Sequence, residues 1–243
     1  MIEVKIDDDV VIHLPTLNGN IAVRVSGGAD SAILLILICD QIRKLNLQEK
    51  VAIYPALCTF VNPDTYGKEI IKIASEQVLL FAREAYPDVR IKDQIQYPII
   101  SSKDMSPEMV KSIYLNELKT GFRYMLKKEY NIDLIFNGAN RNPSYQEALE
   151  FDSEWIEDDV WNFRMSDRDS ENDGIVNSSM VVPFWKINKK QIAKIYEYYK
   201  VTDTLFPLTW SCEGKKEHNG WWTHHCGKCW WCKERMWGFG RLE

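Results

Sequence analysis

The sequence predicts an α/β protein in which helices cover both faces of a parallel sheet, with a small C-terminal lobe built around a metal, most simply zinc. Three observations lead to this fold class. Apolar β-branched segments alternate with segments of helical period, a glycine pair directly follows the first of these strands, and four cysteines gather near the end of the chain. Such alternation is typical of parallel strands joined by helical crossovers.

The strands are expected where short β-branched runs stand between turn residues. They cover residues 21–25, 51–60, 89–97, 133–138 and 180–185, and helices are expected over residues 30–45, 68–86, 107–130 and 189–199. Ser106 and Pro107 form a good helix start, because serine caps a helix and proline fits its first position. Pro55 cannot donate to the ladder, so the second strand is expected to be short or bulged there.

The remaining segments are less regular. The first 20 residues predict a small hairpin beside the sheet, and residues 139–179 show no clean period apart from a short helix near 145–155. Long irregular segments in compact domains are often binding loops. We therefore divide the chain into an α/β domain, residues 1–205, and a C-terminal lobe, residues 206–243.

Composition and charge limit the class of protein. The 243 residues are 45% hydrophobic, and the longest apolar run, residues 32–39, is far shorter than a membrane span. The acidic start lacks the basic region of a secretion signal. Residues 147–173 hold eleven acids against Arg164 and Arg168, within a net charge of −5, which disfavours nucleic acid. We expect a cytoplasmic protein that binds neither membrane nor nucleic acid.

The segment Ser-Gly-Gly-Ala-Asp-Ser, residues 26–31, links the first strand to a helix. A strand that ends in two glycines and turns at once into a helix aims several backbone N–H groups into one small space, which makes an anion site. Gly27 and Gly28 let the backbone approach an anion closely, and the hydroxyls of Ser26 and Ser31 add donors. Asp30 is expected to orient the loop or to hold Mg²⁺. The segment does not match the P-loop motif that cleaves γ-phosphates.

Four cysteines near the C-terminus have metal-ligand spacing: Cys212, Cys226, Cys229 and Cys232. Two-residue gaps let successive thiolates turn back onto one ion, and four thiolates satisfy tetrahedral Zn²⁺. An iron–sulfur cluster is the main alternative, and a mixed site with His218, His224 or His225 is another. Cys39 and Cys58 lie in apolar runs and are expected to be buried, reduced thiols.

The glycine loop resembles the PP-loop of the ATP pyrophosphatases, which have an adenine nucleotide alpha hydrolase-like fold. In that family the loop grips the leaving pyrophosphate of ATP while a substrate oxygen attacks the α-phosphorus. The resemblance implies ATP and Mg²⁺ binding by Ser26, Gly27, Gly28, Asp30 and Ser31, with Asp30 and Ser31 in catalytic roles. It also implies adenine contacts at Thr59 and Phe60, with Gly138 after a later strand completing the nucleotide site.

Together with the segments "VVPFWKINKKQIAKI" and "TWSC...CGKCWWCKERMWGF", this loop resembles the 7-cyano-7-deazaguanine synthase family. In that family the four cysteines hold Zn²⁺, and Arg235 completes the motif here. The resemblance implies a homodimeric carbon–nitrogen ligase of queuosine biosynthesis. Its activity would be the ATP-driven conversion of 7-carboxy-7-deazaguanine and ammonia, through an adenylated carboxylate and an amide, to 7-cyano-7-deazaguanine.

The middle of the chain departs from that family, reading "SIYLNELKTGF" and "NGANRNPSYQEALEFDSEW" where base-recognition segments are typical. The candidates for contacts to the acceptor are Asn140, Arg141, Tyr145 and Glu147. Two enzymatic alternatives stay open: a variant that stops at 7-amido-7-deazaguanine, and a tRNA-modifying PP-loop enzyme. Residues 212–243 carry six basic against four acidic residues, a weak footprint for tRNA. A non-enzymatic zinc-binding module would leave the glycine loop unexplained.

Overall fold

The computed structural model describes residues 1–61, 67–100, 109, 112, 113, 116–118, 120–151, 175–177, 180–213 and 223–243. Its centre is a seven-stranded sheet in the order β5-β4-β3-β7-β9-β8, with β6 also paired to β4. Every pairing is parallel except that of β8 with β9. The strands are β3 (Gly19–Arg24), β4 (Val51–Val61), β5 (Arg90–Ile91), β6 (Ile95–Ile100), β7 (Ile132–Phe136), β8 (Ile175–Asn177) and β9 (Met180–Val181).

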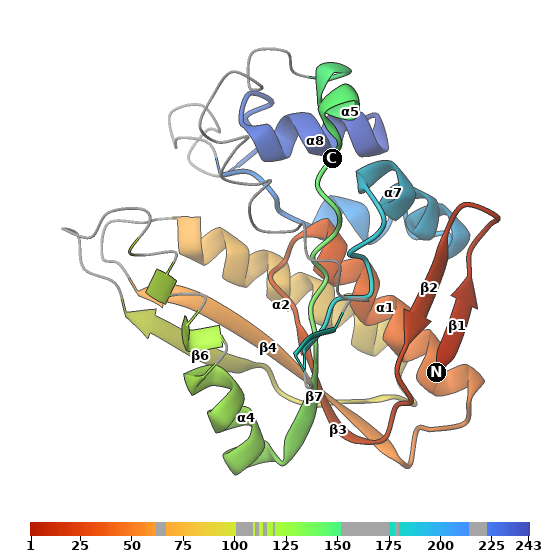
Figure 1. Ribbon diagram of the computed structural model, residues 1–243, viewed down its shortest axis with the longest axis vertical. Helices are drawn as coiled ribbons and strands as arrows, with labels where there is room; N and C mark the ends of the chain where they lie inside the picture. Colours follow the sequence, from red (N-terminus) through yellow and green to blue (C-terminus); the bar gives the residue numbers. More distant parts are fainter. Residues whose placement is uncertain are drawn as a thin grey trace.

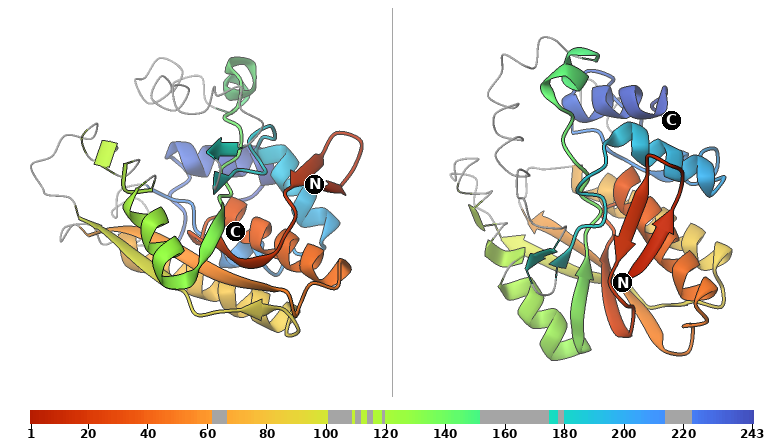
Figure 2. Two further views of the ribbon diagram at one scale, coloured as in Figure 1. Left: turned by 60° about the horizontal axis from the view of Figure 1, so that its bottom comes forward. Right: turned by 45° about the vertical axis from the view of Figure 1, so that its right-hand side comes forward.

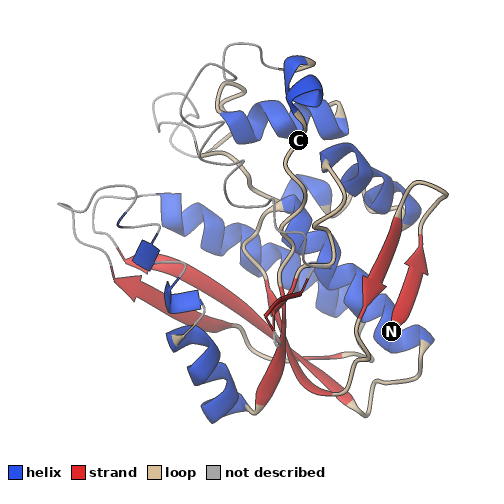
Figure 3. Ribbon diagram, viewed as in Figure 1, coloured by secondary structure: helices blue, strands red, loops and turns tan. Residues whose placement is uncertain are grey.

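The helices of the described residues lie around this sheet, as Figures 1 and 3 show. They are α1 (Ala29–Lys44), α2 (Gly67–Ala85), α4 (Gly121–Tyr130), α5 (Tyr145–Leu149), α7 (Lys189–Tyr198), the short 3₁₀ helix η2 (Phe206–Leu208) and α8 (Trp230–Phe239). The expected N-terminal hairpin is confirmed as β1 (Ile2–Lys5) and β2 (Val11–Leu14), which pair antiparallel. No helix in these ranges is long and apolar enough to span a membrane.

Helices cover both faces of the sheet, which confirms the expected fold class. Successive side chains of a strand point to opposite faces. In β3, Ile21 and Val23 join the larger core with α1, α2 and α7, whereas Ala22 joins a second core with Phe122 and Leu126 of α4. The side of the sheet that carries α1 therefore holds most of the buried apolar surface.

The strand β4 runs unbroken through Pro55, so the expected bulge or shortening is wrong. Its ladder to β5 uses Ala52 and Ile53, and its ladder to β6 begins at Ala56. Pro55 lies in the gap between the two ladders, where β4 has no paired neighbour on that side, so the missing donor interrupts nothing. The same gap divides the strand expected over residues 89–97 into β5 and β6.

Three other element boundaries differ from expectation. The strand expected over residues 180–185 ends at Val181, because the chain turns over residues 183–186. The long helix expected over residues 107–130 is described fully only from Gly121. The sequence pattern also gave no helix at residues 230–239, where α8 forms, since its apolar and polar residues follow no amphipathic stripe.

Candidate active site and metal centre

The glycine loop leaves the carboxyl end of β3 and enters α1 at once. Gly27 has φ +77°, a left-handed conformation that favours glycine. A Cβ atom placed there would lie 2.9 Å from Ala74 Cβ, from the carbonyl oxygen of Ile71 and from the backbone nitrogen of Ser75. All three belong to α2, so the loop packs directly on the backbone of that helix. Glycine is therefore required at position 27 both for its conformation and for its contact.

The hydroxyl group of Ser31 is the centre of the loop. Its Oγ accepts a hydrogen bond from the backbone N–H of Ser26 at 3.1 Å and donates to the carbonyl oxygen of Gly28 at 3.0 Å. The Oγ atoms of Ser26 and Ser31 are also 3.1 Å apart. Ser31 is buried and Ser26 is exposed. Ser31 thus fixes the loop from inside, while Ser26 presents its hydroxyl to the solvent.

The loop offers a group of unpaired amides. Among the described residues, the N–H groups of Gly27, Gly28, Ala29, Asp30 and Ser31 have no protein acceptor. The helix is capped by Gly28 without a side-chain hydrogen bond. Because the N-terminus of α1 also carries the positive end of the helix dipole, these donors form a site for a phosphate-like anion.

Gly138, expected in the nucleotide site, does lie against the loop. A Cβ atom there would be 2.8 Å from the backbone nitrogen of Ser31 and 2.9 Å from the carbonyl group of Asp30. Thr59 and Phe60 are further away along β4. The pairing of β3 with β4 ends at Arg24 and Ala56, so Thr59 stands three residues, or roughly 10 Å, beyond the start of the loop.

Asp30 forms a partly buried ion pair with a residue that the sequence analysis did not single out. Both of its carboxylate oxygens accept from Lys189 Nζ, at 2.7 and 2.6 Å. Lys189 is only 7% exposed and also lies 4.0 Å from the carboxylate of Glu234, which is 2% exposed. This pair suits a role for Asp30 in orienting the loop. A Mg²⁺ ion at Asp30 would have to displace the ammonium group.

The candidate acceptor residues belong to a network around the start of α5. Arg141 forms a bidentate ion pair with Glu147, with N···O distances of 2.9 and 3.0 Å. Burial raises the pKa of Glu147, but hydrogen bonds from Arg141, the Ser144 amide and Asn188 outweigh it and hold the pKa at about 2. Arg141 and Glu147 are thus joined to each other, whereas Tyr145 is exposed and Asn140 is buried.

The network of Glu147 reaches the start of α7 through Asn188. The side-chain amide of Asn188 donates to Glu147 at 2.7 Å, and its Oδ1 caps α7 by accepting from the Gln191 amide at 3.0 Å. The next residue is Lys189, the partner of Asp30. Two consecutive residues therefore connect the acceptor segment and the glycine loop to the same helix end.

The four predicted metal ligands come together. The Sγ atoms of Cys212, Cys226, Cys229 and Cys232 all lie within 4.8 Å of one another. The backbone N–H groups of Lys228 and Cys229 point at Cys226 Sγ, at 3.4 and 3.3 Å. Neighbouring thiols raise the pKa of Cys229 to about 11 and raise that of Cys232 as well. Such crowded thiols ionise together only around a cation, so the donor set fits a tetrahedral metal ion with no further ligand.

The described histidines stand outside this cluster, and His218 lies outside the described residues. His225 stacks on Trp210 with ring centroids 4.5 Å apart, and its Nε2 accepts from the Ser211 amide at 3.4 Å. His224 is exposed. The described part of the chain therefore favours four thiolates over a mixed site.

Arg235, expected to complete the cysteine motif, is buried inside the lobe and joins several of its segments by hydrogen bonds. It is 1% exposed and donates to the carbonyl oxygens of Leu242 and Phe206, at 2.6 and 3.0 Å, and to Thr209 Oγ1 at 2.8 Å. Burial lowers its pKa to about 10. The guanidinium thus ties α8 to η2 and to the segment that leads into Cys212.

Some described tryptophans of the lobe pack in its interior and others make polar contacts. Trp221 and Trp222 lie outside the described residues. Trp230 is fully buried and Phe151, just after α5, contacts both Trp230 and Trp237, with ring centroids 5.1 and 5.3 Å apart. Helices α5 and α8 lie together at one end of the molecule in Figures 1 and 2. The C-terminal lobe therefore packs on the segment that holds the candidate acceptor residues.

Sequence reasoning missed Lys189, Glu234 and Trp210. The Trp210 amide donates to the carbonyl oxygen of Gly27 at 2.8 Å, so the segment before Cys212 also supports the glycine loop. One sequence feature does point to Lys189: a cation at the first position of a helix opposes the helix dipole. A lysine placed there after a good cap, Asn188, indicates a nearby acid.

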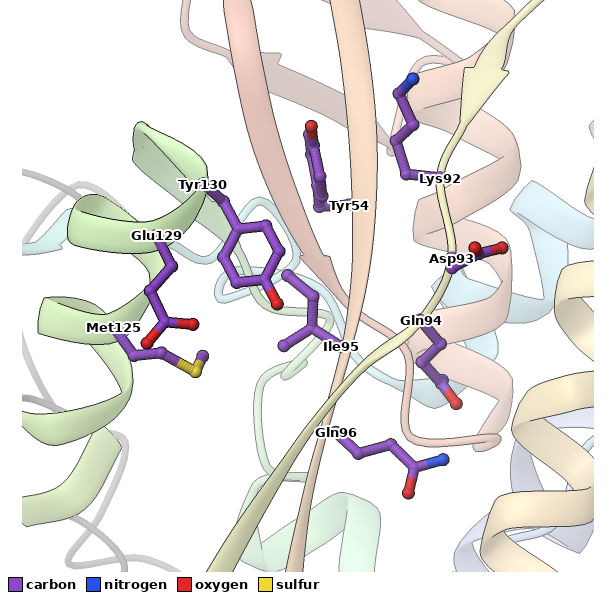
Figure 4. A pocket seen from close by; sticks show the side chains of 9 residues that line it. All are labelled: Tyr54, Lys92, Asp93, Gln94, Ile95, Gln96, Met125, Glu129 and Tyr130. Atoms are coloured by element: carbon purple, nitrogen blue, oxygen red, sulfur yellow. The ribbon is translucent and has the colours of Figure 1, made fainter.

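A cavity of about 490 Å³ lies elsewhere, between α4 and the start of β6. Figure 4 shows Glu129 and Tyr130 of α4 lining one side and Gln94 and Gln96 the other. It opens on the face of the sheet that carries α4, whereas Gly27 packs on α2 across the sheet. It is not part of the site built around the glycine loop.

Two comparisons relate the chain to known proteins, one over its C-terminal part and one over most of its length. Residues 169–243 match the family described as "Queuosine biosynthesis protein QueC". A solved structure, the U34-tRNA thiolase NcsA from Methanococcus maripaludis with its [4Fe-4S] cluster, has a TM-score of 0.43 and 16% identity, over 76% of this chain. The chain spans 57% of that thiolase, and a similarity at this level does not indicate function. No curated protein matches the chain.

Proposed function

We propose that the chain is a QueC-like member of the PP-loop ATP pyrophosphatases, as its motifs predict, and that it converts 7-carboxy-7-deazaguanine and ammonia to 7-cyano-7-deazaguanine at the expense of ATP. One observation carries the proposal. The five unpaired amides of the glycine loop adjoin a four-cysteine lobe, and that lobe lies inside the segment that matches the QueC family. The proposal makes the protein a carbon–nitrogen ligase that releases AMP and pyrophosphate.

The loop suits adenylation more than phosphate transfer to a protein group. Its amides and Ser26 would hold the β- and γ-phosphates of ATP, so that a substrate oxygen can reach the α-phosphorus in line. Preorganised donors stabilise charge that develops on the leaving pyrophosphate, and positioning replaces a protein nucleophile. Mg²⁺ would neutralise the phosphates in this site, and Zn²⁺ in the four-thiolate centre would have a structural role.

The proposed reaction uses the same loop twice. The carboxylate oxygen attacks the α-phosphorus and pyrophosphate leaves; ammonia then attacks the acyl carbon, and AMP leaves with the carboxylate oxygen. The amide oxygen then attacks the α-phosphorus of a second ATP and pyrophosphate leaves again; loss of AMP, which carries the amide oxygen, and of both protons on nitrogen gives the nitrile. An amide is the poorer nucleophile, so this second step depends more strongly on how the acceptor is held.

The acceptor is proposed to lie above Gly138, near Asn140, Arg141, Tyr145 and Glu147. These residues differ in how well their positions suit such a role. Gly138 adjoins the loop and Tyr145 is exposed, whereas Arg141 and Glu147 hold each other. We assign Arg141 and Glu147 to shaping the acceptor segment, and a direct contact to the acceptor would begin with separation of this pair.

The test is a time course with 7-carboxy-7-deazaguanine, ATP, Mg²⁺ and ammonium, followed by mass spectrometry and AMP determination. The complete reaction gives two AMP per nitrile. Accumulation of 7-amido-7-deazaguanine with one AMP identifies the amide-forming variant instead. Absence of any turnover of the carboxylate, with the nucleotide still bound, would contradict the acceptor assignment.

Two controls complete this test. Ser31→Ala removes the hydroxyl at the centre of the loop, so it should slow pyrophosphate release at least tenfold, since positioning errors near 1 Å cost about a hundredfold. Filter binding of tRNA at low and moderate salt addresses the alternative of a tRNA-modifying enzyme, for which binding would be strong at low salt. Homodimer formation stays a prediction from the family resemblance, and a cytoplasmic location stays a prediction from the sequence.

A further inference from the structure

The first turn of α7 is where three parts of the candidate site meet. Asn188 binds Glu147 of the acceptor segment, Lys189 binds Asp30 of the glycine loop, and Lys190 binds Glu150 at 2.8 Å. On the side of the metal lobe, Lys189 faces Glu234, two residues after the ligand Cys232. The first turn of α7 therefore contacts the glycine loop, the segment that holds the candidate acceptor residues, and the C-terminal lobe.

Lys189 is enclosed by α1 and α8. Its ammonium group lies 2.6 and 2.7 Å from the two oxygens of Asp30 and 4.0 Å from Glu234. A Cβ atom added to Gly238 of α8 would lie 2.3 Å from Lys189 Cγ, so α8 packs directly on the lysine stem. The lysine can move only if α8 or α1 moves with it.

Because Lys189 faces acids on two helices, its position depends on both α1 and α8. A buried ammonium is costly unless carboxylates pair with it, and here one buried lysine serves the partly buried Asp30 and the buried Glu234. Loss or displacement of α8 would take Glu234 away and expose the stem of Lys189. The carboxylate of Asp30, at the first turn of α1, would then lose the geometry in which it is held beside the unpaired amides.

We propose that Lys189 is a positioning residue that links the metal centre to the nucleotide cradle: the metal holds α8, α8 holds Lys189, and Lys189 holds Asp30. The inference rests on two parts of the proposed function, a nucleotide at the glycine loop and a metal at the four cysteines, but not on the acceptor. Because such coupling is reciprocal, nucleotide binding must tighten metal retention by the same factor as the metal improves nucleotide affinity.

The first measurement is nucleotide affinity by calorimetry, with the zinc-loaded protein and the Mg²⁺ complex of α,β-methylene-ATP, which cannot be cleaved between its α- and β-phosphates. We expect Lys189→Met to weaken binding about tenfold or more, within the usual range of coupling between sites. Lys190→Met is the matched control, since Lys190 is the adjacent residue and makes an exposed ion pair; its affinity should stay within about twofold of wild type.

The second measurement separates positioning from a merely structural role. Zinc release to a chromogenic chelator is followed with and without the same nucleotide analogue. In the wild type and in Lys190→Met the analogue should slow release about tenfold, whereas in Lys189→Met it should have no effect. A lysine that only stabilises the fold would change both release rates and leave their ratio as it is.

Glu234→Gln supplies an independent variant should Lys189→Met fail to fold. It keeps the Lys189–Asp30 pair but removes the charge on α8, so the effect of the analogue on zinc release should fall at least threefold, in proportion to the lost coupling. An unchanged ratio in either variant would overturn the inference. A wrong acceptor leaves all of these results unaffected, whereas a wild type that does not bind the analogue would refute the nucleotide assignment and this linkage together.

Discussion

The glycine loop and the cysteine lobe are both short motifs, but they obtain their shape in different ways. Residues 26–31 are held by hydrogen bonds around Ser31 and by contact of Gly27 with α2, at the edge of the main core. The lobe has a small apolar cluster around Trp230 and Ala148, and four thiols crowd together at its centre. The loop is thus shaped by the chain itself, whereas the four thiols of the lobe are placed to surround a cation.

Because of this difference, the two regions should respond differently to substitution. An anion site made of backbone amides loses its function when the backbone conformation changes, even if every side chain stays polar. The lobe is expected to lose its fold when its cysteines or the buried Arg235 are changed, because metal binding at such a site contributes folding free energy directly. Substitutions in the two regions should therefore differ in both size and character.

The largest effect is expected from loss of the metal. Cys229→Ser, or removal of metal with a chelator, should unfold residues 206–243, since structural Zn²⁺ sites contribute on the order of 10 kcal/mol of binding free energy. Elemental analysis should give one zinc per wild-type chain, and hydrogen exchange should show the lobe opened in the variant. Cys58→Ser, outside the cluster, should keep its metal. Finding iron in place of zinc would contradict the assignment.

Substitution of Arg235 should have the next largest effect. Arg235→Met leaves the carbonyl groups of Phe206 and Leu242 without their donor inside the lobe, and we expect a loss of about 4 kcal/mol of unfolding free energy, since each hydrogen bond to a charged group is worth roughly 1.5–3 kcal/mol. Chemical denaturation measures it. Arg241→Met, which removes a pair with Asp203 and a hydrogen bond to the carbonyl oxygen of Thr202, should cost less, about 1–2 kcal/mol.

Gly27→Ala tests the backbone origin of the loop. The substitution adds a left-handed strain and places a Cβ atom 2.9 Å from three atoms of α2, so we expect a loss of about 3 kcal/mol and of nucleotide binding. Gly19→Ala is the matched control: its φ is +63°, yet a Cβ atom would meet nothing within 4 Å. It should cost only about 1 kcal/mol. Equal costs at the two positions would mean that contact with α2 is unimportant.

The smallest effect concerns the acceptor segment and depends on pH. The native pKa of Glu147 is held at about 2, below its ordinary value of 4.5. The group therefore contributes stability at all pH values above 4.5, and this contribution is lost as the pH falls from about 4.5 to 2. Glu147→Gln should cost about 1 kcal/mol at pH 7 and flatten this part of the stability profile. An unchanged profile would show that Arg141 and Glu147 are not paired in solution.

The sequence by itself determined the chemistry-bearing motifs and the fold class. Two glycines between a β-branched strand and a helix indicate an anion site, and cysteines with two-residue gaps, such as Cys226, Cys229 and Cys232, indicate a metal site. Both patterns are local, and their geometry is set by backbone and spacing. Alternation of strands and helices likewise determined the parallel sheet with helices on both faces.

Only the tertiary structure decided which groups surround these motifs. Lys189 and Asp30 are 159 residues apart in the chain, and Trp210, which bonds to Gly27, is also distant from it in sequence. No local pattern could therefore pair these residues. It also decided that Arg141 and Glu147 face each other, and that Pro55 falls in a gap between two ladders. These outcomes depend on how distant segments pack, and packing is set by the whole core rather than by any short stretch of sequence.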